Sequence, residues 1–325
     1  MRHSKLDPKA FQSGNLPKFA AVAILLLGLM PGISQAQQQG QKTFASAEEA
    51  GNALATAAQS NDEKAMLAIF GPDGKQVISS GDDVQDQEMH ANFAKKYQEM
   101  HRLVNEPDGT TSLYIGAENW PAPIPLMHKG NTWYFDTEAG TREILYRRVG
   151  RNEITTIRVC QELVAAQKEY FSESHNTYAQ KFFSSEGQRD GLYWKADAGA
   201  PQSPIGPLVA SAVAEGYEKI PEGGATPFHG YYFHILYAQG HHAPGRSKNY
   251  IVAGKMTGGF AFVAYPAEYR SSGVMTFIVG SDGVVYEKDL GKNTESIVKA
   301  MKKFDPDSSW HKTEDEKEQS ASQQK

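Results

Sequence analysis

An apolar run near the N-terminus sets the compartment and the redox state in which the rest of this chain folds. Phe19 to Leu29 is apolar apart from Gly28, and three lysines precede it, Lys5, Lys9 and Lys18. Ser34-Gln35-Ala36 then places small residues at the two positions that a signal peptidase requires. A membrane-spanning helix needs about 20 apolar residues, and this run is shorter. The pattern predicts a signal peptide over residues 1–36, cleaved after Ala36, and a mature protein that is periplasmic or secreted.

Charge and cysteine content narrow the class of the mature protein. Residues 1–36 contain four basic residues and one acidic residue, so their removal changes the formal net charge from −5 to −8. An acidic chain offers no basic face to nucleic acid, and we predict neither nucleic-acid binding nor stable membrane insertion after cleavage. Cys160 is the only cysteine, so no internal disulfide can form and stability must come from buried apolar area. We expect Cys160 to be a buried helical residue.

The first part of the mature chain predicts helices followed by a small antiparallel sheet. Ser46 and Glu49 form a capping-box pattern at the start of a helix. Apolar residues at helical spacing predict a longer helix over 84–104. Lys129-Gly130-Asn131 is a hairpin turn, and the aromatic strand 132–135 follows it.

A long helix is predicted over much of 138–174. Five side chains fall close to one stripe that we expect to be buried, Ile154, Ile157, Cys160, Val164 and Phe171. Gly150 can break this helix in two. Such a break is the natural boundary between an N-terminal domain (44–150) and a C-terminal domain (151–304).

The C-terminal part is rich in strands. Four are predicted, at 231–236, 260–265, 274–279 and 284–287, and the turns between neighbours in the chain imply an antiparallel sheet. Short helices are predicted at 207–214 and 294–303. The polar residues 305–325 are predicted to form a disordered tail. The fold class is therefore α+β, with N-terminal helices and a small sheet, a long helix, and a C-terminal antiparallel sheet with flanking helices.

Several sequence blocks resemble those of the domain-of-unknown-function family 2950. They are WYFDT (133–137), RRVGRNE (147–153), AQKEY (166–170), HGYYF (229–233) and YEKDLG (286–291). The resemblance spans about residues 44–304. It implies a secreted bacterial protein, and it implies no activity.

Two looser likenesses concern shape. The N-terminal helices and hairpin are similar to cone-shaped domains of the nuclear-transport-factor-like type. The second half is similar to the globular part of a type II pseudopilin. The apolar segment at 20–29 is not continuous with the long helix, and no prepilin leader is present. The second likeness therefore implies a fold and leaves fibre assembly in doubt.

Arginine and tryptophan supply the candidate ligand contacts. Arg147, Arg148 and Arg151 on the long helix could hold a phosphate or a carboxylate, although a solvated helix face also explains them. Trp120 lies among prolines and is a candidate for an exposed contact. Trp133 could line an apolar mouth or pack in the core.

Four histidines crowd into fourteen residues, His229, His234, His241 and His242. Positions five apart in a strand face opposite sides, and adjacent histidines rarely bind one ion. No cysteine or carboxylate at ligand spacing completes a set. We predict no metal ion and no cofactor, and we keep His229 as a weak candidate for ligand contact.

No catalytic motif is recognisable in the chain. The leading hypothesis is an exported, non-catalytic protein that binds an envelope protein or a small ligand. One alternative is a hydrolase whose residues converge only in the folded chain. Another is a structural subunit of a pilus-like or secretion assembly.

Overall fold

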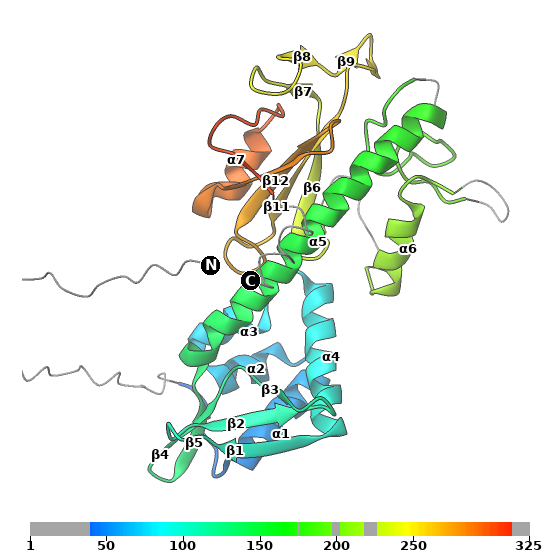
Figure 1. The fold of residues 1–325 in the computed structure, drawn as a ribbon. Coiled ribbons are helices and arrows are strands. Elements are labelled where there is room, and N and C mark those ends of the chain that lie inside the picture. Colours follow the sequence, from blue (N-terminus) through cyan, green and yellow to red (C-terminus); the bar gives the residue numbers. More distant parts are fainter. Residues whose placement is uncertain (1–39, 174–175, 197–201, 218–225, 314–325) are drawn as a thin grey trace, which may run out of the picture. The chain divides into compact units, whose positions relative to one another are not determined.

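Helix α5 (Thr137–Glu173) connects two groups of elements in the computed structural model (Figure 1). The structure describes residues 40–173, 176–196, 202–217 and 226–313. The predicted signal peptide at 1–36 lies outside the described residues. The elements form an α+β fold with antiparallel sheets, as predicted.

The first group packs short helices against a small sheet. Its helices are α1 (Ala47–Gln59), α2 (Glu63–Phe70), the 3₁₀ turn η1 (Pro72–Gly74), α3 (Lys75–Ile78) and α4 (Asp83–Glu99). Its strands are β1 (His101–Asn105), β2 (Thr111–Ile115), β3 (Trp120–Pro121), β4 (Leu126–Lys129) and β5 (Thr132–Phe135). The strand order is β1-β2-β4-β5, with β3 on β2.

Local sequence explains how this group starts and turns. The Ser46 hydroxyl accepts a hydrogen bond from the Glu49 N–H at 3.1 Å, which confirms the predicted cap of α1. The Glu49 carboxylate accepts from the Ala45 N–H at 2.9 Å. The predicted hairpin is also confirmed, since β4 and β5 pair across a turn in which Gly130 has a φ of +60°.

The helix predicted over 84–104 is wrong in its last turn. Helix α4 ends at Glu99, and Met100 has extended backbone angles. Residues 101–105 form β1 and pair with β2. The turn residues Pro107-Asp108-Gly109 signal this hairpin, and the pairing outweighs the helical spacing of the apolar residues before it.

Helix α5 continues through Gly150, so the predicted break is wrong. A glycine inside a helix costs only about 1 kcal/mol relative to alanine, which does not end a helix held by packing on both sides of it. The predicted stripe is also wrong in part, because Ile154 is 45% exposed. Cys160 and Val164 are buried as expected, and the buried face is centred on Asn152 and Leu163 instead.

The second group is built around a five-stranded antiparallel sheet. The strand order is β14 (His311–Lys312), β13 (Val285–Asp289), β12 (Met275–Gly280), β11 (Ala261–Pro266) and β6 (Tyr231–Leu236). The group also contains three helical elements, α6 (Gly206–Ala214), η2 (Gly291–Asn293) and α7 (Thr294–Ala300). Two short strand pairs complete it: β7 (Ala238–Gln239) pairs with β8 (Lys248–Asn249), and β9 (Ile251–Val252) pairs with β10 (Lys255–Met256). The four predicted long strands are confirmed.

Strand β11 lies at the centre of the second core. All six of its residues are buried, because α5 covers one face of the sheet and α7 the other (Figure 1). Strand β6 is the edge strand next to it. This edge, together with α7, forms the wall of a cavity described below.

Residues 305–313 return to the second sheet, although we predicted them as part of a disordered tail. Phe304 is buried, and β14 pairs with β13. Pairing and an apolar anchor fix this segment despite its polar composition. Residues 314–325 lie outside the described residues.

The division into domains at 44–150 and 151–304 stays a prediction. The residues that the structure describes all belong to one compact unit. Their buried apolar side chains form one large cluster in the second group and two smaller clusters in the first. Helix α5 contacts elements of both groups.

Candidate functional site

Arg148 is buried inside the protein and does not face solvent. The residue is 5% exposed. Its Nη1 and Nη2 atoms donate to the carbonyl oxygens of Gln76 and Val77, each at 2.8 Å. These carbonyls lie in the last turn of α3, where a helix leaves its acceptors without internal partners. The guanidinium that we considered for anion binding is therefore engaged by the backbone.

Arg147 and Arg151 lie on the exposed side of the same helix. The Arg147 Nε donates to the Glu143 carboxylate at 2.6 Å, and its guanidinium lies over the Trp120 ring, 5.6 Å from the ring centroid. Trp120 is 37% exposed on the short strand β3. Because Arg148 points into the protein, the structure does not bring the three arginines together as one anion site.

Trp133 and His229 both have partners within the protein. Trp133 is half-buried and packs against the first core, with its ring 5.3 Å from that of His128. His229 Nε2 lies 3.0 Å from the Glu215 carboxylate, and the His229 N–H donates to the Tyr217 hydroxyl at 3.1 Å. These contacts place Trp133 in the first group and His229 in the second, in separate environments.

A buried polar seam joins the start of α5 to the segments beside it. We define the polar seam by six residues, Asp82, Gln85, Asp86, Arg148, Asn152 and Ser272. Asn152 Nδ2 donates to the Ser272 carbonyl at 2.9 Å, and Gln85 Nε2 donates to Asn152 Oδ1 at 2.9 Å. Asp82 accepts from the Tyr217 hydroxyl and the Gly230 N–H, each at 2.8 Å. Sequence reasoning missed this network because its members are far apart in the chain.

Burial controls the titration of the charged groups in and near the seam. Desolvation raises the pKa of the Asp86 carboxyl, although hydrogen bonds from Ser80 and the charge of Arg148 act in the opposite direction. Desolvation also lowers the pKa of the neighbouring His90 imidazole. Neither of the two cavities described below is lined by these groups. The seam therefore has a structural explanation that requires no ligand.

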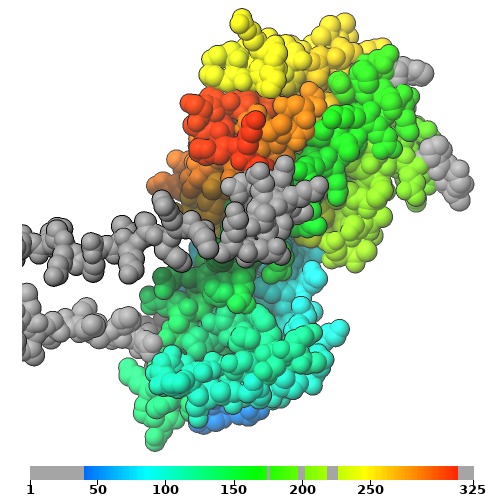
Figure 2. Space-filling view, in the orientation of Figure 1, coloured from blue at the N-terminus to red at the C-terminus, as the bar shows by residue number. Residues whose placement is uncertain are grey.

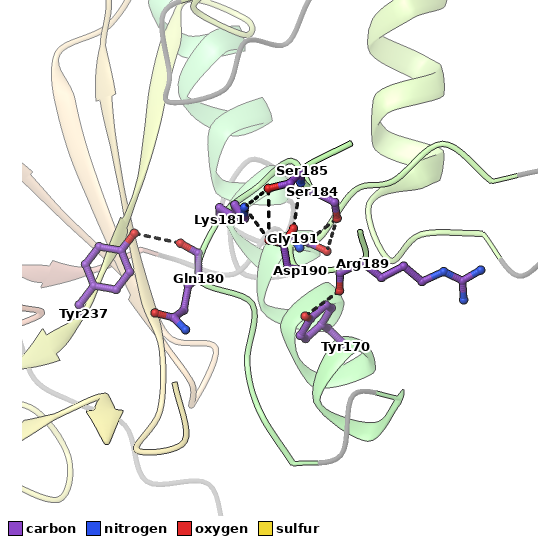
Figure 3. Close-up of polar contacts among 9 residues, drawn as sticks. All are labelled: Tyr170, Gln180, Lys181, Ser184, Ser185, Arg189, Asp190, Gly191 and Tyr237. Carbon is purple, nitrogen blue, oxygen red and sulfur yellow. Dashed lines mark hydrogen bonds and ion pairs between the residues drawn. The ribbon is translucent and has the colours of Figure 1, made fainter. Parts of the chain in front are cut away.

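Lys181, Ser185 and Asp190 form a second polar cluster, shown in Figure 3. The Lys181 ammonium lies 2.6 Å from the Ser185 hydroxyl and 2.7 Å from the Asp190 carboxylate. The Ser185 N–H also donates to Asp190 at 2.9 Å. The hydrogen bond from Lys181 lowers the pKa of Asp190. Each polar group of this cluster therefore has a partner within it, and these contacts hold the loop between residues 181 and 190 together.

Cys160 is buried and free, as predicted. Desolvation raises the pKa of its thiol to about 12. The reactive thiolate form is therefore scarce near neutral pH, and the residue acts as a core side chain.

A cavity of about 220 Å³ lies between β6 and α7. We call it the β6–α7 pocket. Its walls are the end of β6 and the residue after it (234–237), Val263 of β11, and four residues in and after α7, Val298, Lys299, Met301 and Lys302. Valine, isoleucine, leucine and methionine supply an apolar lining, and two lysines lie beside it.

The charged groups of the β6–α7 pocket are mostly cationic. Lys299 forms an ion pair with Glu295 at 2.5 Å. Among the described residues, Lys302 has no ion-pair partner. His234 is stacked on Tyr265, and its Nε2 lies 3.1 Å from the Tyr265 hydroxyl. Burial, followed by the charge of Lys299, lowers the pKa of His234, so its imidazole is neutral near pH 7.

A second cavity is smaller and more apolar. It has a volume of about 60 Å³ and lies beside α5 and α6, with Leu163, Phe182 and Phe228 among its lining residues. Its lining carries no charged side chain. Ligand pockets combine an apolar surface with a few polar groups that fix orientation. The β6–α7 pocket meets this description and the smaller cavity does not.

Only one of the polar residues that line the β6–α7 pocket was a candidate on sequence grounds. His234 belongs to the group of four histidines considered as a metal site, whereas Lys299 and Lys302 belong to no recognisable motif. Lys299 lies in the last turn of α7, and Lys302 follows the helix, which ends at Ala300. Lysines near the end of this helix could have indicated a basic helix end, although not the strand that it faces.

None of the helices in the described residues is long and apolar enough to cross a membrane. No curated protein sequence and no solved structure matches the chain. The likenesses to cone-shaped domains and to pseudopilins stay predictions. Residues 41–313 match a family described as protein of unknown function, DUF2950, and the chain belongs to that family.

Proposed function

We propose that this protein is an exported, non-catalytic binding protein that holds a small anionic ligand in the β6–α7 pocket. One observation carries the proposal: two lysines, Lys299 and Lys302, line the β6–α7 pocket, whose other walls are mostly apolar. A lysine ammonium attracts a carboxylate or a phosphate, and the apolar wall accepts the rest of the ligand.

Size and charge define the class of ligand. Drug-sized ligands occupy pockets of about 300–1,000 Å³, and the β6–α7 pocket of about 220 Å³ suits a smaller molecule. Glu295 offsets the charge of Lys299, which leaves Lys302 as the cation available to a ligand. A short aliphatic or aromatic carboxylate, or a small phosphate ester, matches this arrangement.

The polar groups of the pocket are arranged for holding a ligand. Lysine ammonium groups donate hydrogen bonds, and His234 is held against Tyr265 by stacking and by the contact of its Nε2. Burial raises the pKa of Tyr265 to about 12, so its hydroxyl stays protonated and can donate to His234. These groups support binding and orientation more than proton transfer.

Export rests on the predicted leader, together with the resemblance to secreted bacterial proteins. Cleavage after Ala36 would leave Gln37 as the first residue. Mass spectrometry of protein recovered from the periplasm or medium of expressing bacteria should find that terminus. An intact Met1 in cytosolic protein would contradict export. It would not contradict ligand binding in the β6–α7 pocket, which the next experiment tests.

Binding can be tested with hexanoate, a short apolar carboxylate, against hexanamide, its neutral analogue. We expect calorimetry on the mature chain to show hexanoate binding more tightly than hexanamide. The double substitution Lys299→Ala and Lys302→Ala should weaken hexanoate binding by about tenfold or more, equivalent to about 1.4 kcal/mol. Lys303→Ala is the matched control, because Lys303 is the next exposed lysine and does not line the pocket.

Phenyl phosphate provides the second arm of this experiment. A preference for it over hexanoate would assign the pocket to phosphate esters within the same class of anionic ligand. Equal binding of hexanoate and hexanamide would contradict an anion pocket. So would a loss of hexanoate affinity in Lys303→Ala as large as that in the double variant.

A further inference from the structure

Two adjacent histidines and a distant aspartate meet at the surface of the second group. His241 and His242 follow β7, and Asp305 follows the buried Phe304. The Gly240 N–H donates to the Phe304 carbonyl at 2.8 Å, which places the two segments side by side. In Figure 2 the surface of the last described residues (red) borders that of the residues around 240–255 (yellow). A carboxylate 63 positions away in the chain thus reaches the histidine pair.

The donor atoms of this cluster converge. One ligand atom from each of the three side chains lies within 4.8 Å of the others. His242 Nδ1 is 3.1 Å from the Asp305 carboxylate, and the two imidazole centroids are 3.7 Å apart. Adjacent residues in a strand would point to opposite faces, but residues 241–243 form a bend. The bend turns both rings to one side, which removes the objection that adjacent histidines cannot share an ion.

The backbone around the cluster is held in place by its own contacts. The Gln239 side chain donates to the carbonyl oxygens of Pro244 and Arg246, each at 2.6 Å, and accepts from the Tyr250 hydroxyl at 3.0 Å. Gly240 packs directly on Asp305, where a Cβ would overlap the carboxylate. The His242 N–H donates to Asp305 at 2.8 Å. These contacts fix the bend and the aspartate before any ion binds, which lowers the cost of assembling a site.

We propose that His241, His242 and Asp305 bind a divalent transition-metal ion, with Zn²⁺ as the representative ion. Two imidazole nitrogens and one carboxylate oxygen are typical ligands of Zn²⁺, which binds them at about 2.0–2.2 Å. Tetrahedral binding at that length brings the donors to about 3.3 Å from one another. The two histidines are exposed at the surface, so rotation of their side chains can bring the donor atoms to this separation. Water or a group from another molecule would complete the coordination.

The test is a titration of tag-free mature protein with Zn²⁺, followed by calorimetry, with Co²⁺ absorption as a second readout of histidine coordination. We expect one ion to bind per chain. His241→Ala and His242→Ala should each weaken binding by about tenfold or more. Asp305→Asn, which keeps an oxygen for the His242 N–H, should also weaken binding while leaving the circular dichroism spectrum unchanged.

His128→Ala is the matched control, because His128 is an exposed histidine on β4 away from this cluster. It should bind Zn²⁺ as the unaltered chain does. Absence of Zn²⁺ binding at millimolar concentration would overturn the proposal. So would equal binding by the unaltered chain and by folded variants at His241 and His242, since the ion would then lie elsewhere.

Discussion

The two halves of α5 bury different kinds of side chain. The first half, to Asn152, buries Arg148 and Asn152 against backbone carbonyls and polar loops. The second half buries Val159, Leu163 and other apolar side chains against β11 and β12. Apolar burial stabilises the second half through area removed from water. The first half depends on complete hydrogen bonding, because each buried polar group that loses its partner costs free energy.

The largest expected effect tests the polar half. Arg148→Met keeps the length of the side chain but removes both donors to the carbonyls of Gln76 and Val77. It also removes the positive charge that acts on the buried Asp86. Breaking a buried charged contact from one side costs about 3–5 kcal/mol. We expect the free energy of unfolding in urea to fall by that amount, and a loss below about 1 kcal/mol would contradict a structural role for Arg148.

A smaller loss is expected where α5 begins. Gly140 lies against the backbone of the segment before β4, and a Cβ there would sit 2.6 Å from both the Ile124 Cα and the Pro123 carbonyl oxygen. Overpacking of this kind costs about 1–3 kcal/mol, and the helix preference of alanine returns about 1 kcal/mol. Gly140→Ala should therefore lower the free energy of unfolding by up to about 2 kcal/mol. An increase would show that the two segments can move apart freely.

The same substitution ten residues later should have the opposite sign. A Cβ at Gly150 would meet nothing within 4 Å, and α5 is continuous there. Gly150→Ala should raise the free energy of unfolding by about 0.5–1 kcal/mol, because alanine favours the helix and restricts the unfolded chain. Thermal unfolding of the two alanine variants side by side gives the comparison. Destabilisation at Gly150 would mean that the helix needs to bend at this position.

These contrasts explain how far the sequence predicts the fold. Strands such as β6 and β11 were predictable because their apolar runs end at turn residues. The end of α4 was not, because pairing of residues 101–105 with β2 is a long-range effect. The burial of Arg148 was not predictable either. The helical spacing of apolar residues does not show which polar residue donates to the carbonyl groups of another segment.

The candidate sites were less predictable than the fold for the same reason. Trp120 is partly exposed, as its neighbouring prolines indicated. Lys302 is a candidate ligand contact only because it lies beside the strand β6. His241 is a candidate metal ligand only because residues 304–305 return to β7 and bring Asp305 near it. Contacts between distant segments decide these sites, and a single sequence does not display them.

The smallest expected effect compares neighbouring arginines directly. Arg147→Met removes the ion pair with Glu143, worth about 0.3–0.5 kcal/mol, and the contact over the Trp120 ring. Both partners are exposed enough that water and salt screen the pair. The free energy of unfolding should fall by about 0.5 kcal/mol, and the loss should shrink near 1 M NaCl, where the Debye length is about 3 Å. The same substitution at Arg148 should show little salt dependence, because its partners are buried carbonyls. An equal loss of stability in Arg147→Met and Arg148→Met would contradict the view that burial makes Arg148 more important to stability than Arg147.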